Sequence, residues 1–180
     1  MTLIATRRIH SGRVIDLDID TVRFPDGSTG EMEMIRHSGA SAVVPVLSDP
    51  AGADPTILLI RQFRHATGGV LWEIPAGRLA PGEAPDRCAR RELLEETGMQ
   101  AEQLEPMTVI WTTPGFTDER IHLFCAWDLT EGVSAREADE FIELVPRPLS
   151  QVLTGIQDGE IGDAKTVAAI LYMAGFRLGL

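Results

Sequence analysis

The stretch from Gly77 to Met99 reads GRLAPGEAPDRCARRELLEETGM and contains three glutamates, Glu92, Glu95 and Glu96, within five positions. Like charges three or four residues apart on a helix repel each other by about 0.2 to 0.5 kcal/mol per pair. The chain already carries a formal net charge of −11, so the cluster adds to an existing excess of negative charge. It is either a solvated acidic surface or a site that binds cations, and the neighbouring residues must decide between the two.

The same stretch predicts one helix with defined ends. Good helix formers fill Pro85 to Thr97, and proline suits the first helical position because an N–H group there would lack a helical partner anyway. Gly98 suits the left-handed residue that ends a helix. Ala89 and Leu93 lie four residues apart and can face the core, which would leave the three carboxylates pointing outward together.

Composition predicts a single compact domain of enzyme size. The chain has 180 residues, of which 44% are hydrophobic and 24% charged. No apolar run reaches the roughly 18 residues of a membrane helix, and the N-terminus lacks an apolar signal core, so we expect a cytoplasmic protein without membrane contact. A pI near 4.7 argues against nucleic acid as a partner, because such binders carry a basic face. Cys88 and Cys125 are expected to be buried, reduced thiols.

Extended segments alternate with helices along the rest of the chain. Residues 12–37 form two alternating runs around a Pro-Asp-Gly turn, which predicts a β-hairpin. Further strands are predicted at residues 40–47, 56–64, 70–76, 107–113, 121–129 and 141–145, and helices at 149–157 and 164–177, the last with Asp163 as its N-cap. This order predicts an α/β/α sandwich of mixed sheets at residues 39–180, preceded by an N-terminal β-hairpin region at residues 1–38.

The glutamates belong to a longer pattern. Counted from Gly77, the stretch matches G-x5-E-x7-R-E-U-x-E-E-x-G-U, where U is aliphatic, at every fixed position. With background frequencies near 7% per position, a chance match is on the order of one in a million chains. The stretch therefore resembles the signature of the Nudix hydrolases. The resemblance implies the Nudix fold and hydrolysis of a nucleoside diphosphate linked to a second group.

The resemblance also implies roles for the residues of the signature. The implied metal ligands are two principal glutamates, a further glutamate that also belongs to the catalytic residues, and one backbone carbonyl: Glu92, Glu96, Glu95 and Ala76, in that order. The implied structural residues are Gly77, Glu83, Arg91 and Gly98. Gly77 would permit the turn that exposes the Ala76 carbonyl, and Arg91 would pair with a helix carboxylate and hold it in place.

Such a ligand set suits Mg²⁺, with Mn²⁺ as a substitute. Hydrolysis of a diphosphate requires water to approach a phosphorus surrounded by negative oxygens, and divalent cations neutralise those oxygens and acidify the water. Mg²⁺ prefers oxygen ligands and usually keeps several waters, so a few carboxylates are sufficient. The mutual repulsion of the glutamates becomes a favourable interaction once cations bind.

Other segments resemble the ADP-ribose pyrophosphatase subgroup of this family. Pro114 lies fifteen residues after Met99, a Gln-Phe-Arg triplet ends at Arg64, and a Trp-Glu pair ends at Glu73. The match closes with GEIGDAKTVAAILY at residues 159–172. The implied substrate contacts are Arg36, Arg61, Arg64, Glu73, Pro114 and Phe116. A plain Pro-Gly turn and ordinary strand-end ion pairs are the alternatives for the proline and the arginines.

The resemblance places a water-activating glutamate on the acidic segment AREADEFIEL, residues 135–144. Glu140 fits this role best by its distance from Gly77, and Glu137, Asp139 and Glu143 remain open. A carboxylate there could accept a proton from the attacking water. A solvated acidic loop is the alternative.

The resemblance further implies a homodimer in which the N-terminal region exchanges between subunits. Arg36 or Ile35 would then reach the base pocket of the partner. The aromatic candidates for stacking on the base are Trp72, Trp111 and Phe116, each of which would also suit the core.

We therefore expect metal-dependent hydrolysis of the small-molecule nucleotide ADP-ribose to AMP and ribose 5-phosphate. Hydrolysis of another nucleoside diphosphate sugar, such as GDP-mannose, is the alternative within the same chemistry. A sensor that binds ADP-ribose without cleaving it is the alternative of another class. The pattern does not distinguish which phosphorus is attacked.

Overall fold

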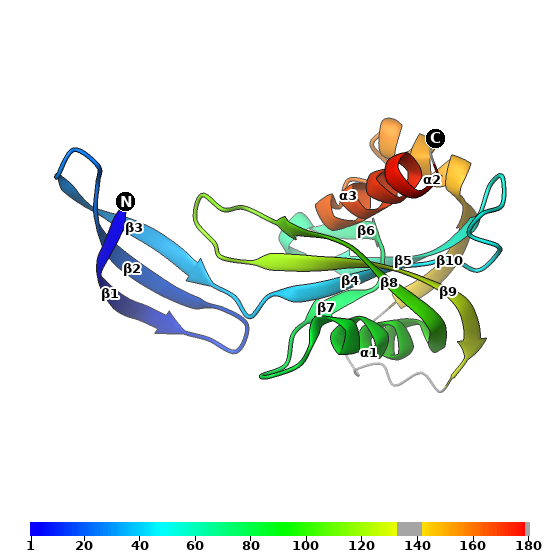
Figure 1. Cartoon of the computed structure of the whole chain (residues 1–180), viewed down its shortest axis with the longest axis horizontal. Helices are drawn as coiled ribbons and strands as arrows, with labels where there is room; N and C mark the ends of the chain where they lie inside the picture. Colours follow the sequence, from blue (N-terminus) through cyan, green and yellow to red (C-terminus); the bar gives the residue numbers. More distant parts are fainter. Residues whose placement is uncertain (133–141, 179–180) are drawn as a thin grey trace.

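The computed structural model describes residues 1–132 and 142–178, and it has a layered α/β architecture with a small sheet projecting from one end (Figure 1). The strands are β1 Thr2–Ser11, β2 Asp16–Arg23, β3 Thr29–Arg36, β4 Ala40–Pro45, β5 Thr56–Arg64, β6 Gly69–Glu73, β7 Ala76–Arg78, β8 Met99–Trp111, β9 Arg120–Glu131 and β10 Ile142–Pro148. The helices are α1 Pro85–Thr97, α2 Leu149–Gln157 and α3 Ala164–Met173, with a short 3-10 turn at His65–Thr67. No helix in this described part has the length and apolar character needed to span a membrane.

Two sheets form the body of the molecule, and both mix strands that are distant in sequence. In the described residues, one sheet has the order β7-β4-β9-β8, with β4 and β9 parallel, and the other has the order β10-β5-β6. Helix α1 lies on one side of the sheets, and α2 and α3 lie on the other (Figure 1). The predicted α/β/α sandwich is therefore confirmed.

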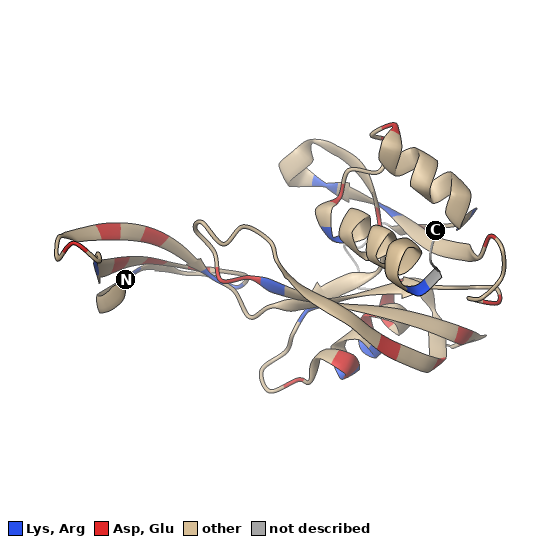
Figure 2. Cartoon of the chain, turned by 45° about the horizontal axis from the view of Figure 1, so that its top comes forward, with Lys and Arg blue, Asp and Glu red and all other residues tan. Residues whose placement is uncertain are grey.

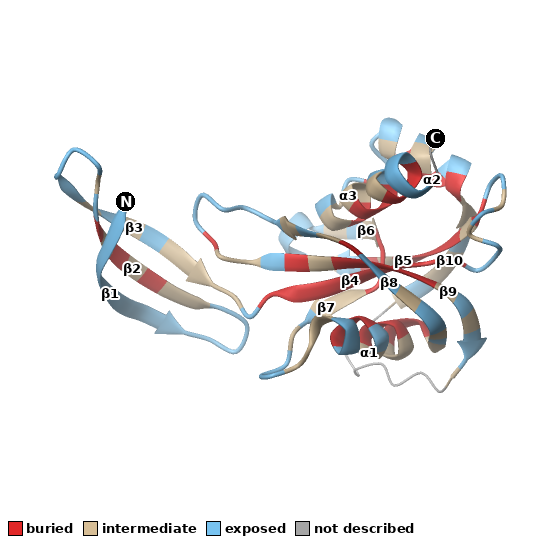
Figure 3. Cartoon of the chain, in the orientation of Figure 1, coloured by how far each residue is buried: buried red, intermediate tan, exposed pale blue. Residues whose placement is uncertain are grey.

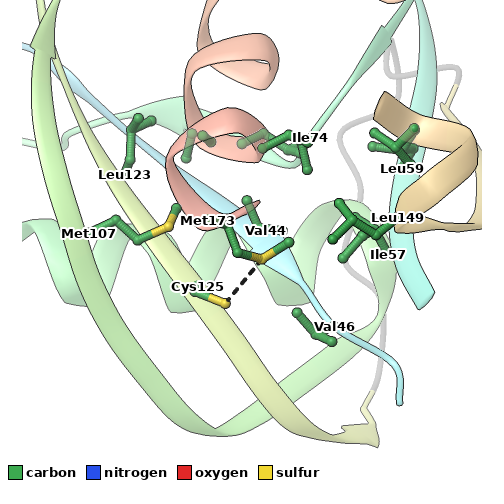
Figure 4. Close-up of a cluster of buried hydrophobic side chains, with 14 of the residues drawn as sticks. Val44, Val46, Ile57, Leu59, Ile74, Met107, Leu123, Cys125, Leu149 and Met173 are labelled. Atoms are coloured by element: carbon green, nitrogen blue, oxygen red, sulfur yellow. Dashed lines mark hydrogen bonds between the residues drawn. The ribbon is translucent and has the colours of Figure 1, made fainter. Parts of the chain in front are cut away.

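The main core lies between the sheets and the two C-terminal helices. Figure 4 shows its centre, where side chains from β4, β5, β8 and β9 meet those of α2 and α3. Val44, Leu59 and Ile170 are fully buried there. The Cys125 thiol packs 3.9 Å from the Met173 sulfur, and both cysteines of the chain are buried, as the sequence predicted.

A second core cluster holds α1 against the opposite face of the sheet. Ala89 and Leu93 are fully buried against Val43, Phe124 and Ala126. The helix begins at Pro85 and ends at Thr97. The following residue, Gly98, has a left-handed φ of 74°, and its N–H donates to the Leu94 carbonyl at 2.8 Å. The predicted limits of this helix are confirmed, because they depend on local residues whose backbone preferences are strong.

The C-terminal helices match their predicted starts, but one ends earlier than expected. The Asp163 carboxylate caps α3 by accepting from the Thr166 N–H at 3.0 Å. The α-helix ends at Met173 and is followed by a π-helical turn at Ala174–Leu178. The prediction of a single helix at 164–177 is therefore wrong at its C-terminal end.

The N-terminal region is a three-stranded antiparallel sheet rather than the predicted hairpin. The expected hairpin exists as β2 and β3, joined by a turn in which Gly27 has a φ of 87°. Strand β1 pairs with the other edge of β2 and is exposed at every position (Figure 3). No sequence pattern predicted this strand, because a strand exposed on both faces shows no apolar alternation.

This N-terminal sheet joins the body through its last strand. The Ile35 N–H donates to the Phe116 carbonyl at 2.7 Å, and the Asp118 N–H donates to the Ile35 carbonyl at 3.3 Å. The Arg36 guanidinium lies 3.5 Å from the Asp118 carboxylate. The loop between β8 and β9 is therefore held by the N-terminal sheet.

Candidate active site

The candidate site lies where β7 meets α1. Glu92 and Glu96 are buried there, with 8% and 3% of their surface exposed, although the sequence suggested that all three glutamates point outward. The Ala76 N–H donates to the Glu96 carboxylate at 3.0 Å. A Cβ atom built on Gly77 would overlap the Glu92 carboxylate, so glycine is required for this close approach. The two carboxylates thus lie beside the backbone of Ala76 and Gly77.

Arg91 organises the remaining carboxylates of the signature. Its guanidinium lies 2.6 Å from Glu92, 2.8 Å from Glu95 and 2.9 Å from Glu83. It also donates to the Arg78 carbonyl at 3.1 Å. These contacts join the helix to the loop that precedes it and fix the rotamer of Glu92.

Glu83 is the loop end of this network. Its second oxygen accepts from the Ala80 N–H at 2.9 Å. The carboxylate therefore stabilises the turn at Ala80 as well as pairing with Arg91. The hydrogen bonds from Arg91 lower the pKa of Glu83 from 4.5 to about 2, against an opposing effect of burial. The pairing with Arg91 thus favours the ionised form of Glu83.

A pocket of about 510 Å³ opens beside Ala76 and Gly77. Its walls carry the cationic groups Arg64, Arg78 and Lys165, together with the exposed indole of Trp111. The carboxylates that line the pocket are those of Glu119 and Asp163, whereas Glu92 and Glu96 contact Ala76 and Gly77 but are not themselves part of the lining. Cations on the wall and carboxylates close to its β7 edge suit a diphosphate accompanied by divalent ions.

Two of these cations are held by one buried carboxylate. Glu73 is 1% exposed, and the Arg64 guanidinium donates to its two oxygens at 2.7 and 2.8 Å. Lys165 donates to Glu73 as well, and to Asp163 at 3.0 Å. Burial raises the pKa of Glu73 and the contacts with Arg64 and Lys165 lower it, with a net shift downward. Glu73 thus fixes the position of both cations at the pocket wall.

The donor atoms at the junction of β7 and α1 are suitable for Mg²⁺. They are carboxylate and carbonyl oxygens, which hard cations prefer. In residues 1–132 and 142–178, no three acidic, histidine or cysteine side chains converge at ligating distance. Two directly bound glutamates, a backbone carbonyl and water would still complete an octahedral Mg²⁺, because this ion usually retains several waters.

The other predicted substrate residues lie farther along the surface. Arg61 stacks 5.0 Å over Trp72 and pairs with Glu143 at 2.8 Å, and none of these three residues lines the pocket. Phe116 is half exposed and lines a neighbouring hollow of about 320 Å³ beneath β3, two residues from Pro114. Arg36 pairs with carboxylates of the N-terminal sheet. Among the predicted substrate residues, Arg64 is the one that lines this pocket, and its ion pair with Glu73 fixes its position.

The predicted water-activating residue, Glu140, lies outside the described residues, and so do Glu137 and Asp139. Glu143 is described and points to Arg61. The role of Glu140 stays a prediction.

Lys165 is the pocket residue that sequence reasoning missed. The chain contains fifteen arginines and a single lysine, so a lone ammonium among guanidinium groups was a signal available in the sequence. His37 and Glu119 also line the pocket and come from segments that carried no motif. Only the tertiary structure brings these residues together.

Comparisons with known proteins agree with this geometry. The NUDIX domain family model matches residues 37–170. The chain is 40% identical over 172 residues to a "Methanol dehydrogenase activator" of Bacillus methanolicus and also to an "ADP-ribose pyrophosphatase" of Bacillus subtilis; each alignment covers 94% of this chain and 90% of the relative. A solved structure titled "Crystal structure of ADP compounds hydrolase" superposes with a TM-score of 0.84 at 22% identity, covering 99% of this chain and 94% of that chain.

Proposed function

The chain belongs to the Nudix family, and from this membership we propose that it is a pyrophosphohydrolase of nucleoside diphosphate sugars with ADP-ribose as its substrate. The observation that carries the proposal is the pairing of two buried glutamates, Glu92 and Glu96, with the backbone of Ala76 and Gly77 at the wall of a cationic pocket. A solvated acidic face would not bury these two carboxylates.

Glu92 and Glu96 would hold Mg²⁺ with the Ala76 carbonyl, and Mn²⁺ would be a substitute. When bound, the metal neutralises phosphate oxygens and makes water more acidic. Arg91 keeps the Glu92 and Glu95 carboxylates in fixed positions through its ion pairs. Arg64 and Lys165 bind the phosphate oxygens of the substrate, and Glu73 keeps both cations oriented toward the pocket.

Water attacks one phosphorus of the diphosphate, the bridging P–O bond breaks, and AMP and ribose 5-phosphate leave. A carboxylate on the acidic segment, with Glu140 as the candidate, accepts the proton of the water. The cationic wall stabilises the charge that develops on the phosphate oxygens, which is the largest contribution that preorganised groups make to such a step.

The active form is proposed to be a homodimer. The N-terminal sheet exposes Leu3, Ile4 and Ile9 at 57%, 48% and 46% of their surface, and apolar side chains on a strand exposed at every position are suited to burial against a second subunit. Light scattering after size exclusion should give a dimer for the full chain and a monomer for Ile4→Arg. A monomeric wild-type protein with full activity would contradict this part of the proposal.

The main test measures initial rates over a panel of ADP-ribose, GDP-mannose, UDP-glucose and NADH, with Mg²⁺ and with EDTA. We expect ADP-ribose to give the highest kcat/KM, with AMP as the product and no rate in EDTA. Faster turnover of GDP-mannose would keep the chemistry and change the substrate. Calorimetric binding of ADP-ribose without release of AMP would favour the sensor instead.

A further inference from the structure

We propose that the pocket continues into a second, arginine-lined compartment that accepts an additional phosphate monoester on the nucleoside half of the substrate. The proposal rests on the proposed function, because it extends the same substrate site. A nucleoside diphosphate sugar phosphorylated on its nucleoside ribose would then be preferred to the unphosphorylated compound.

The second compartment adjoins the first. It has a volume of about 790 Å³ and lies between the turn from β1 to β2 and the loop that follows β7. His37 and Arg78 line both pockets, so a ligand bound at Ala76 can extend past these two side chains without leaving the surface. The two pockets therefore adjoin each other at these two side chains.

The lining of the second compartment is cationic in a strongly acidic protein. It contains Arg13, Arg36, Arg78 and Arg91 but only one carboxylate, that of Asp16, whereas the chain carries a net charge of −11. Arg36 and Arg91 each form ion pairs with three carboxylates, so their charge is already neutralised within the protein.

Arg13 and Arg78 differ from the other two arginines. Within residues 1–132 and 142–178, neither has an ion pair with a carboxylate, and both are exposed. The Arg78 guanidinium donates to the Arg13 carbonyl at 3.1 Å, which places the two residues side by side. Both residues line the compartment, and guanidinium groups without acidic partners in the described residues are suited to a phosphate dianion, because each can donate two hydrogen bonds to its oxygens.

The apolar part of the lining indicates which half of the substrate enters. Val14, Ile15 and Leu79 line the same compartment and offer an apolar surface to a planar base. Arg64 and Lys165 hold the diphosphate in the first pocket. The nucleoside therefore lies toward the N-terminal sheet, where a phosphate on its ribose can reach Arg13 and Arg78.

The test compares ADP-ribose with its adenosine 2′-phosphate derivative. Hydrolysis of the derivative adds water across the diphosphate and gives adenosine 2′,5′-bisphosphate and ribose 5-phosphate. We expect the wild-type KM to be about tenfold lower for the derivative, the size expected of charge-assisted hydrogen bonds. The preference should disappear in the double variant Arg13→Gln/Arg78→Gln and persist in Arg7→Gln/Arg87→Gln, which removes two exposed arginines outside both pockets.

Equal KM values in the wild type, or a preference that survives in Arg13→Gln/Arg78→Gln, would overturn the inference while ADP-ribose hydrolysis stands. If neither compound is cleaved, the proposed function fails, and calorimetry in EDTA then tests the compartment alone. There, adenosine 2′,5′-bisphosphate should bind about tenfold more tightly than AMP in the wild type and no more tightly in the double variant. Equal binding of the two in the wild type would overturn the inference.

Discussion

Two arginines in this molecule each pair with three carboxylates, and their surroundings differ. Arg91 lies on α1 and pairs with glutamates of the signature, whereas Arg36 ends β3 and pairs with Asp18, Asp20 and Asp118. The positions of acidic residues along the strands of the N-terminal sheet are coloured red in Figure 2. The first network lies against a glycine backbone, and the second ties a projecting sheet to the body, although both arginines line the compartment of about 790 Å³.

The difference shows that charge pairing alone does not identify a catalytic site. In both regions, acidic residues recur at the spacing of one face, which is three or four residues on the helix and two on the strand. Burial does not separate the two regions, because Asp18 is 2% exposed and Glu96 is 3% exposed. What distinguishes the helix is that the Glu96 carboxylate accepts from the backbone N–H of Ala76, next to Gly77. A buried carboxylate beside a backbone segment that itself lines a pocket is the feature that suits a metal ion.

A substitution at Glu96 should show the largest difference between the two networks. We expect Glu96→Gln to lower kcat/KM for ADP-ribose by about three orders of magnitude, because a metal ligand contributes several kcal/mol to transition-state stabilisation. The amide can still accept from the Ala76 N–H, so the melting temperature should stay close to that of the wild type. Glu33→Gln, at an exposed position of β3, is the matched control. Wild-type activity in Glu96→Gln would reduce the signature glutamates to structural residues like those around Arg36.

The close approach at Gly77 should have the next largest effect. In Gly77→Ala the new Cβ would overlap the Glu92 carboxylate and displace it, and a misplacement of this kind costs about a hundredfold in rate. Gly69→Ala is the control, since a Cβ there meets no atom within 4 Å in the described structure. Kinetics at increasing Mg²⁺ would show a raised metal requirement in Gly77→Ala alone. Equal rates in the two variants would mean that Glu92 does not need its present position.

The two regions also differ in how well the sequence predicted them. Helix α1 was predictable to the residue because Pro85 and Gly98 have strong local preferences and Ala89 and Leu93 have helical spacing. The family pattern predicted Gly77 as a structural residue of the turn that exposes the Ala76 carbonyl, whereas its close approach to Glu92 was not predicted. Strand β1 was missed because its residues are exposed on both faces, so its pairing with β2 depends on backbone hydrogen bonds that no side-chain pattern reports.

The pocket wall was predicted only in part, for a related reason. Arg64 and Glu73 were found through resemblance, whereas Lys165 is far from both in sequence and meets Glu73 only when α3 packs on the sheets. The burial of Glu92 and Glu96 was also missed. A helical wheel shows which side chains share a face, but the packing of strand β7 against that face is a tertiary feature.

The Arg36 network should matter for stability and little for the metal site. Asp18 is 2% exposed and pairs with both Arg8 and Arg36. Asp18→Asn removes the charge while keeping the volume, so we expect a melting temperature lower by a few degrees. The Mg²⁺ concentration that gives half-maximal rate should be unchanged. A shift in that concentration, measured on protein kept well below its melting temperature, would show that the two networks are coupled.

The smallest effect concerns the pH dependence of the Arg91 network. The pKa of Glu83 is lowered from 4.5 to about 2, so its ionised form stabilises the folded state above pH 4.5, and this contribution is lost as the pH falls from 4.5 toward 2. Glu83→Gln should therefore be less stable than the wild type at pH 7, with a difference that narrows at pH 3. Urea unfolding of both proteins at the two pH values measures this difference. A constant difference would mean that Glu83 acts through its hydrogen bond to Ala80 rather than its charge, and the Arg91 network would then be held together differently from the ion pairs of the N-terminal sheet.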